Sequence, residues 1–269
     1  MIRTFVLVSK ELRDLLRNWG LLVALILPAL LIPALALASL GAVTGAELGS
    51  LTSLIPLRPN LAVPPELLGA SPRELAQYAV LSPFFMIALI FPVTVPSILA
   101  AASIVGEKES GTLEGLLATP IRTWELLLGK AFASLLPAVV LTWLPFGAMV
   151  LGAQQMTTPQ VVAATLTSGP WLFGIFVLAP TLALLTIMFL IIVSAWATEV
   201  RTANQLGAVL IAPLVAMLVL QATQGVAFTM GKLLGLWGVA MTLLLLTQPV
   251  ALRLFQRETI LVRWKQAGS

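Results

Sequence analysis

The sequence contains no cysteine and no histidine among its 269 residues, and charged residues make up only 10% of it. Without cysteine there is no disulfide or thiolate chemistry, and nothing indicates the redox compartment. Without histidine the chain lacks the commonest general base and the commonest ligand of transition metals. Apolar residues instead make up 59%, and the mean hydropathy is +1.03. These values exclude an ordinary soluble domain and indicate a membrane protein.

Uncharged runs long enough to cross a bilayer, which takes about 20 residues, recur along the whole chain. The longest, residues 131–198, would extend about 100 Å as one helix against a hydrocarbon core of about 30 Å, so it must turn back. Polar residues and proline gather at 153–170 and predict that turn. We predict an all-α integral membrane protein, a single transmembrane domain over 1–269. Its six transmembrane helices are expected at 20–40, 79–105, 131–152, 171–195, 206–224 and 233–252.

The two ends of the chain carry topology signals. Residues 1–18 predict an amphipathic interfacial helix, although a basic lead-in to the first span is the alternative. A signal peptide is the alternative for the first span, whose apolar run of about 21 residues exceeds the usual 7–15. Twelve Lys and Arg residues fall on the side of the two termini and three on the other. Both termini, including the tail 253–269, are therefore expected to be cytoplasmic, and the high pI reflects topology and not nucleic-acid binding.

The expected spans contain no Asp, Glu, Lys or Arg. Ion-coupled secondary transporters usually need such groups at membrane depth, so this alternative is disfavoured. No G-x-x-x-x-G-K-[ST] motif occurs, so any nucleotide chemistry must come from a partner. A non-transporting membrane scaffold or an intramembrane enzyme is a further alternative. The enzyme lacks the usual histidine, cysteine or carboxylate, although a Ser-Lys pair is not formally excluded.

Proline and polar side chains within the spans are candidates for a substrate pathway. Internal prolines in 79–105 predict a kinked helix packed in protein, and the kink either shapes a cavity or serves packing. The two glutamines near the end of 206–224 either line the pathway or bind a neighbouring helix. Trp19, Trp171 and Trp237 are expected in interfacial belts. The pathway candidates are Pro92, Thr94, Pro96, Gln221 and Gln224.

Residues 106–130 carry seven charged side chains, each costing about 2.5–3.5 kcal/mol at the centre of a bilayer, so they form a water-exposed connector. The connector reads EKESGTLEGLLATP from Glu107 to Pro120, followed by Glu125 and by Gly129-Lys130. This pattern resembles the signature of the permease subunits of type-2 ABC transporters. Residues 201–206 and 255–258 also look like parts of that family, more weakly.

The resemblance implies the permease subunit of an ABC exporter in a prokaryotic plasma membrane, pairing with itself or a sibling permease. Two separate cytoplasmic ATP-binding-cassette ATPases would bind ATP and Mg, so this chain is expected to hold no cofactor and to be no enzyme. The 106–130 segment would be the coupling segment, with leucines filling a groove on the ATPase and glutamates at its rim. A solvated loop is the alternative. The expected interface residues are Glu107, Lys108, Glu109, Gly111, Thr112, Leu113, Glu114, Leu117, Pro120, Glu125 and Arg201.

Overall fold

The computed structural model describes residues 2–46, 63–106, 123–194, 197, 199–224 and 229–254, and its regular elements there are all helices. Six helical stretches are long and apolar enough to cross a membrane, which confirms the predicted all-α membrane fold. They are Trp19–Gly45, Pro72–Ser103, Leu128–Met156, Gly169–Ser194, Val200–Gln221 and Met230–Ala251, and we call them spans 1 to 6.

The described helices and helical turns follow one another along the chain. They are α1 (Ile2–Arg17), α2 (Trp19–Gly45), η2 (Pro65–Leu67), α4 (Pro72–Leu81), α5 (Phe84–Ala100), η3 (Ala101–Val105), α8 (Thr123–Met156), α9 (Pro159–Ala164), α10 (Gly169–Phe173), η4 (Gly174–Leu178), α11 (Ala179–Ser194), α12 (Val200–Gly207), η5 (Ala208–Ile211), α13 (Ala212–Gln224) and α14 (Met230–Leu254). Spans 2, 4 and 5 are each assembled from several of these elements. A turn at Ser82 and Pro83 divides span 2, whereas the π turn η4 interrupts span 4 and the 3-10 turn η5 interrupts span 5.

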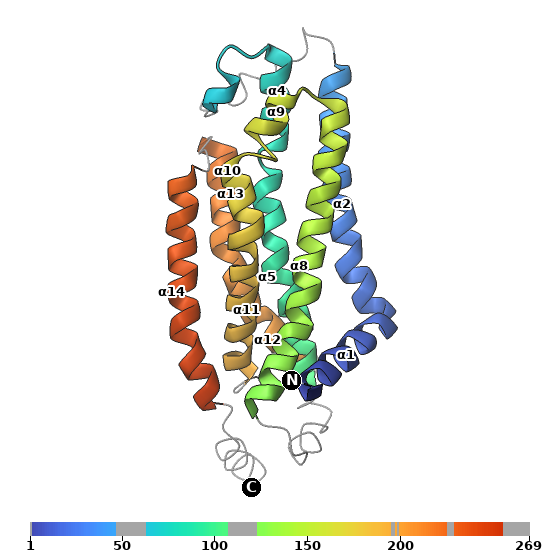
Figure 1. Ribbon diagram of the computed structural model, residues 1–269, viewed down its shortest axis with the longest axis vertical. Coiled ribbons are helices and arrows are strands. Elements are labelled where there is room, and N and C mark those ends of the chain that lie inside the picture. The colour runs from blue at the N-terminus through green and yellow to red at the C-terminus, as the bar shows by residue number, and fades with distance from the viewer. Residues whose placement is uncertain are drawn as a thin grey trace.

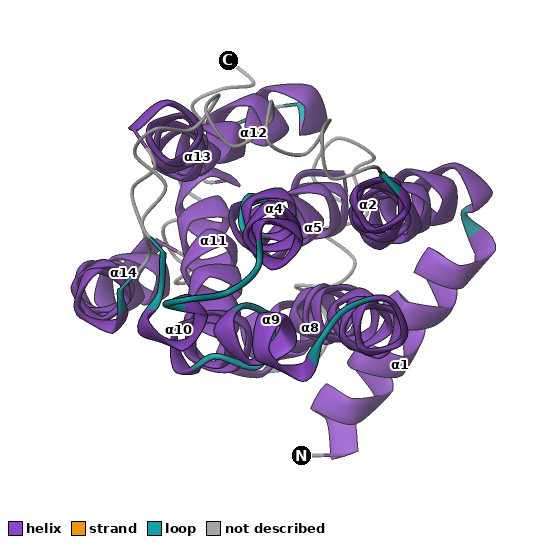
Figure 2. Ribbon diagram, turned by 90° about the horizontal axis from the view of Figure 1, so that it is seen from above, coloured by secondary structure: helices purple, strands orange, loops and turns teal. Residues whose placement is uncertain are grey.

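The spans form one bundle with α1 lying across one end, which we call the base (Figure 1). The opposite end, the top, carries α4 and α9. Seen from above, α5 lies in the middle, with α2, α8, α11 and α13 around it (Figure 2). Span 2 accordingly has the highest share of buried residues of the six, whereas spans 5 and 6 have the lowest.

Hydrogen bonds at the top join three spans. A capping box begins α4, since Ser71 Oγ accepts from the Glu74 amide and the Glu74 carboxylate accepts from the Ser71 amide. The buried Gln77 side chain donates to Thr44 Oγ1 at 2.9 Å and accepts from Thr157 Oγ1 at 2.6 Å. Because these threonines end α2 and follow α8, Gln77 holds the tops of spans 1, 2 and 3 together.

Proline shapes span 2 as expected. The helix is divided between α4 and α5 at Pro83, and two further prolines lie inside α5. Polar groups bind carbonyls near these sites: Ser82 Oγ donates to Ala79 O at 3.4 Å, and Thr94 Oγ1 donates to Ile90 O at 3.2 Å. Ala79 O is the carbonyl to which residue 83 would donate in a regular helix, so the Ser82 hydroxyl replaces the donor that Pro83 lacks.

An aromatic cluster fills the core between spans 2, 3 and 4. The ring of Trp171 lies 4.9 Å from that of Phe85 and 6.3 Å from that of Phe146. The prediction of an interfacial Trp171 is therefore wrong, since its side chain is buried. Trp19, in contrast, is 77% exposed beside α1. Gly174 faces Phe85 so closely that a Cβ there would lie 2.5 Å from Phe85 Cε2.

Candidate functional site

Most of the predicted coupling residues lie outside the described residues. These are Glu107, Lys108, Glu109, Gly111, Thr112, Leu113, Glu114, Leu117 and Pro120. Glu125 lies in the first turn of α8 and is half-buried, and Arg201 lies exposed in the first turn of α12. The described ends of the segment are Gly106, after η3, and Thr123, where α8 begins, and both ends lie at the base (Figure 1).

Lys130, at the end of the predicted connector, is buried in the base. Its side chain is only 3% exposed. Its Nζ donates to Ser103 O and to Ser103 Oγ, both at 2.8 Å, and lies 3.4 Å from Glu11 Oε1. The prediction of a connector exposed to water throughout is therefore wrong at this residue. These polar partners compensate the burial of the ammonium, because an unpaired buried charge is strongly unfavourable.

The backbone around Lys130 is adapted to these contacts. Ser103 lies in η3, a single π turn, and such turns displace carbonyls from the regular helical hydrogen-bond ladder. Gly129 allows α1 to approach, since a Cβ there would lie 2.5 Å from Leu7 Cδ2. Leu7 and Glu11 are four residues apart on α1 and thus share one face of that helix. Helix α1 therefore contacts α8 through an apolar residue and an ion pair side by side.

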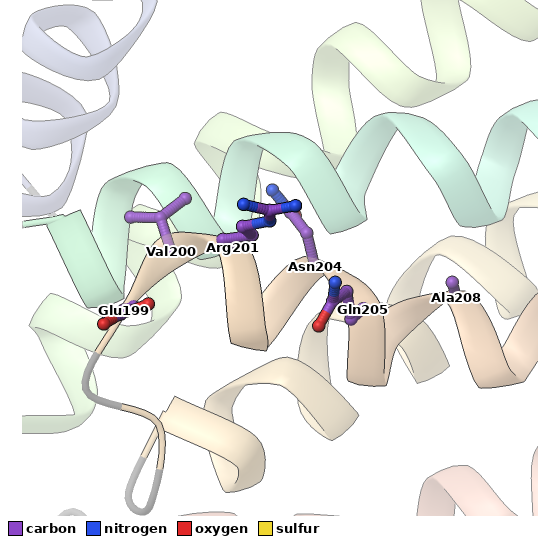
Figure 3. A pocket seen from close by; sticks show the side chains of 6 residues that line it. All are labelled: Glu199, Val200, Arg201, Asn204, Gln205 and Ala208. Carbon is purple, nitrogen blue, oxygen red and sulfur yellow. The ribbon is translucent and has the colours of Figure 1, made fainter.

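A shallow pocket of about 750 Å³ lies along α12 near the base. Arg201 and Asn204 project from the same side of this helix (Figure 3). The six residues that line the pocket are Glu199, Val200, Arg201, Asn204, Gln205 and Ala208. The pocket thus places the basic group of Arg201 and the amide group of Asn204 at the surface of the base, where span 5 begins.

The contact between span 2 and span 5, which we call the seam, contains unsatisfied polar atoms. In the described part of the chain, the buried side-chain oxygens without a hydrogen-bond partner are Ser97 Oγ, Asn204 Oδ1 and Gln221 Oε1. Ser97 is on α5, and the other two are on α12 and α13. Each such atom costs about 1–3 kcal/mol. The seam is therefore less completely hydrogen-bonded than the rest of the described chain.

The five predicted pathway residues differ in their surroundings. Pro92 and Pro96 are buried within α5, and the Thr94 hydroxyl is bound to carbonyls of its own helix. Gln221 Nε2 donates to Ser82 O at 3.1 Å, so this side chain does bind a neighbouring helix while its own oxygen stays unpaired. The side chain of Gln224, in the last turn of α13, lies outside the description.

Sequence reasoning did not select several residues that the structure places in these two sites. They are Leu7, Glu11, Ser97, Ser103, Lys130 and Asn204. One signal was available for the base, because Gly129-Lys130 forms part of the recognised pattern. The partners of Lys130 come from 27 and 119 residues away, and no local pattern indicates such contacts.

Six apolar helices in one bundle, with a buried basic site at the base, define a multi-pass helical membrane protein. The family model described as "ABC-2 family transporter protein" matches residues 5–263. The chain therefore belongs to the ABC-2 transporter family and is a transmembrane permease component of a transporter. A search of curated proteins found no match.

Proposed function

We propose that this chain is the membrane-spanning subunit of an ABC exporter, in which residues 106–130 couple the spans to a separate cytoplasmic ATPase that binds ATP and Mg. The observation that carries the proposal is the family match over residues 5–263. Two further points support it: the coupling signature falls within the match, and the chain has no nucleotide-binding motif of its own. The complex is a dimer of permease subunits in a prokaryotic plasma membrane, with both termini cytoplasmic.

In this proposal the base receives the mechanical work. The coupling segment joins the end of span 2 directly to the start of span 3, so force on it acts first on η3 and α8. Span 2 lies in the middle of the bundle and meets span 5 at the seam. Movement of span 2 then opens the seam and exposes its unpaired oxygens to substrate. Because the spans are apolar with amide and hydroxyl groups, an amphiphilic or hydrophobic substrate fits best.

Reversing two charges in the coupling segment tests the proposal. Glu107→Lys/Glu114→Lys is expected to lower permease-stimulated ATP hydrolysis at least about tenfold, because like charges then meet across the docking surface. The measurement is ATP hydrolysis by the partner ATP-binding-cassette ATPase, reconstituted with the permease in lipid vesicles. Glu66→Lys, in η2 at the top, is the control and is expected to retain stimulation. Unchanged stimulation in the double variant contradicts coupling through this segment.

The orientation is tested by reporters at the two ends of the bundle. A reporter fused at Ser110 is expected in the cytoplasm, and one fused at Gln155 on the outside. Gln155 lies exposed in the last turn of α8, at the top, 45 positions after Ser110. The measurement is paired alkaline phosphatase and fluorescent-protein activity in a bacterial host. Activity of both fusions on the same side contradicts the proposed topology.

A further inference from the structure

The ammonium of Lys130 joins three parts of the chain at one point. Ser103 belongs to η3, which precedes the coupling segment, and Lys130 belongs to α8, which follows it. Glu11 belongs to α1, and its carboxylate is only 15% exposed. A single side chain therefore joins the entry of the coupling segment, its exit and the helix at the base.

The energetics favour keeping these contacts. Removing one partner of a buried charge pair is strongly destabilising, because a charge is left uncompensated. Lysine offers three donors in a compact head, and here two of the contacts go to the same serine. The hydroxyl and the carbonyl of Ser103 thus fix η3 against α8, and the Glu11 carboxylate fixes α1 against both.

Apolar contacts continue the same face of α1. Leu7 is 7% exposed and lies against Gly129, and Leu15 packs against a core cluster formed by α2, α5, α8 and α11. Leu7, Glu11 and Leu15 are spaced by four residues, which places them along one side of the helix. The opposite side exposes Phe5 and Leu16, as expected for a helix at the headgroup level.

We propose that Lys130 is a positioning residue that fastens α1 and both ends of the coupling segment into one rigid unit. The inference rests on the proposed function, because it assigns how work delivered to the segment reaches the spans. When the segment is displaced, Lys130 keeps η3 and α8 together and makes α1 follow them. Without Lys130, the segment moves without carrying spans 2 and 3 and α1 as one body.

The first test measures the geometry and needs no ATPase. The chain has no native cysteine, so spin labels on Arg13→Cys in α1 and Leu136→Cys in α8 report one distance. Lys130→Met is expected to broaden the distribution of that distance in lipid vesicles, and Lys130→Arg to keep it narrow. Glu11→Gln, which retains the lysine, is expected to broaden it less. Lys232→Met, at an exposed lysine of α14, is the matched control. A narrow distribution in Lys130→Met overturns the proposal.

The second test asks whether the fastening acts on coupling. Lys130→Met is expected to lower stimulated ATP hydrolysis at least about tenfold while co-purification with the ATPase is retained, since positioning and not docking is lost. A disulfide between Leu7→Cys and Gly129→Cys, formed by an oxidant, re-joins α1 to α8 but not η3 to α8, and is therefore expected to restore part of the stimulation in that background. Unchanged stimulation in Lys130→Met overturns the proposal. Unchanged stimulation in Glu107→Lys/Glu114→Lys would instead contradict coupling through this segment. The distance measurement tests the contacts of Lys130 without any ATPase and is independent of that result.

Discussion

Oxidising a Ser97→Cys/Gly207→Cys variant is expected to arrest ATP hydrolysis by the reconstituted complex, and reduction is expected to restore it. A Cβ at Gly207 would lie 3.4 Å from Ser97 Cβ, near the range of about 3.5–4.5 Å that a disulfide requires. The bond would join α5 to α12 and hold the seam closed. Because the proposed cycle needs this seam to open, hydrolysis should fall at least about tenfold while the bond is intact.

The matched control is the Leu7→Cys/Gly129→Cys pair in an otherwise unchanged chain. There a Cβ at Gly129 would lie 3.3 Å from Leu7 Cβ, so the disulfide is equally feasible. It joins α1 to α8, which Lys130 already holds together in the proposed rigid unit. Hydrolysis is therefore expected to stay within about twofold of that of the unmodified chain. Both measurements use hydrolysis with and without a reducing agent. Full hydrolysis with the Ser97–Gly207 disulfide formed would show that span 2 and span 5 do not separate.

Gly174→Leu is expected to destabilise the membrane domain more than any exposed substitution. A Cβ at Gly174 would lie 2.5 Å from Phe85 Cε2, and Phe85 is only 1% exposed and packed on Trp171. Overpacking of this kind costs about 1–3 kcal/mol and sometimes more.

The measurement is the midpoint of thermal unfolding in detergent, followed by fluorescence-detected size exclusion. Gly235→Leu on α14 is the control, since a Cβ there meets nothing within 4 Å. We expect a loss of several degrees, or loss of the folded peak, for Gly174→Leu alone. An equal midpoint for both variants would show that the contact with Phe85 relaxes freely.

The membrane fold could be predicted because its signals are local. Long uncharged runs bounded by charges indicate spans, and Ser71 with Glu74 indicates a helix start through neighbouring atoms alone. Lys130 could not be placed in the same way. Its sequence neighbours suggest a solvated loop, and it is buried because α1 returns to contact Gly129.

The position of Trp171 also depends on contacts with distant parts of the chain, which local sequence does not reveal. Tryptophan at the end of an apolar run usually lies at the membrane interface, and this rule supported the wrong prediction. Phe85 and Phe146, on two other spans, provide a buried aromatic site instead. The unpaired oxygens of Ser97, Asn204 and Gln221 were equally invisible, since a missing partner is a property of packing and not of composition.

The hydrogen bonds of Gln77 have a consequence for where cargo would leave the proposed exporter. They hold the top ends of spans 1, 2 and 3 side by side, so an exit between those three helices requires breaking buried bonds to two threonines. An exit beside Gln221 requires breaking one hydrogen bond, from Gln221 Nε2 to Ser82 O, since Gln221 Oε1 has no partner to lose. The exported molecule would thus leave between spans 2 and 5, past uncharged side chains that can form hydrogen bonds to it.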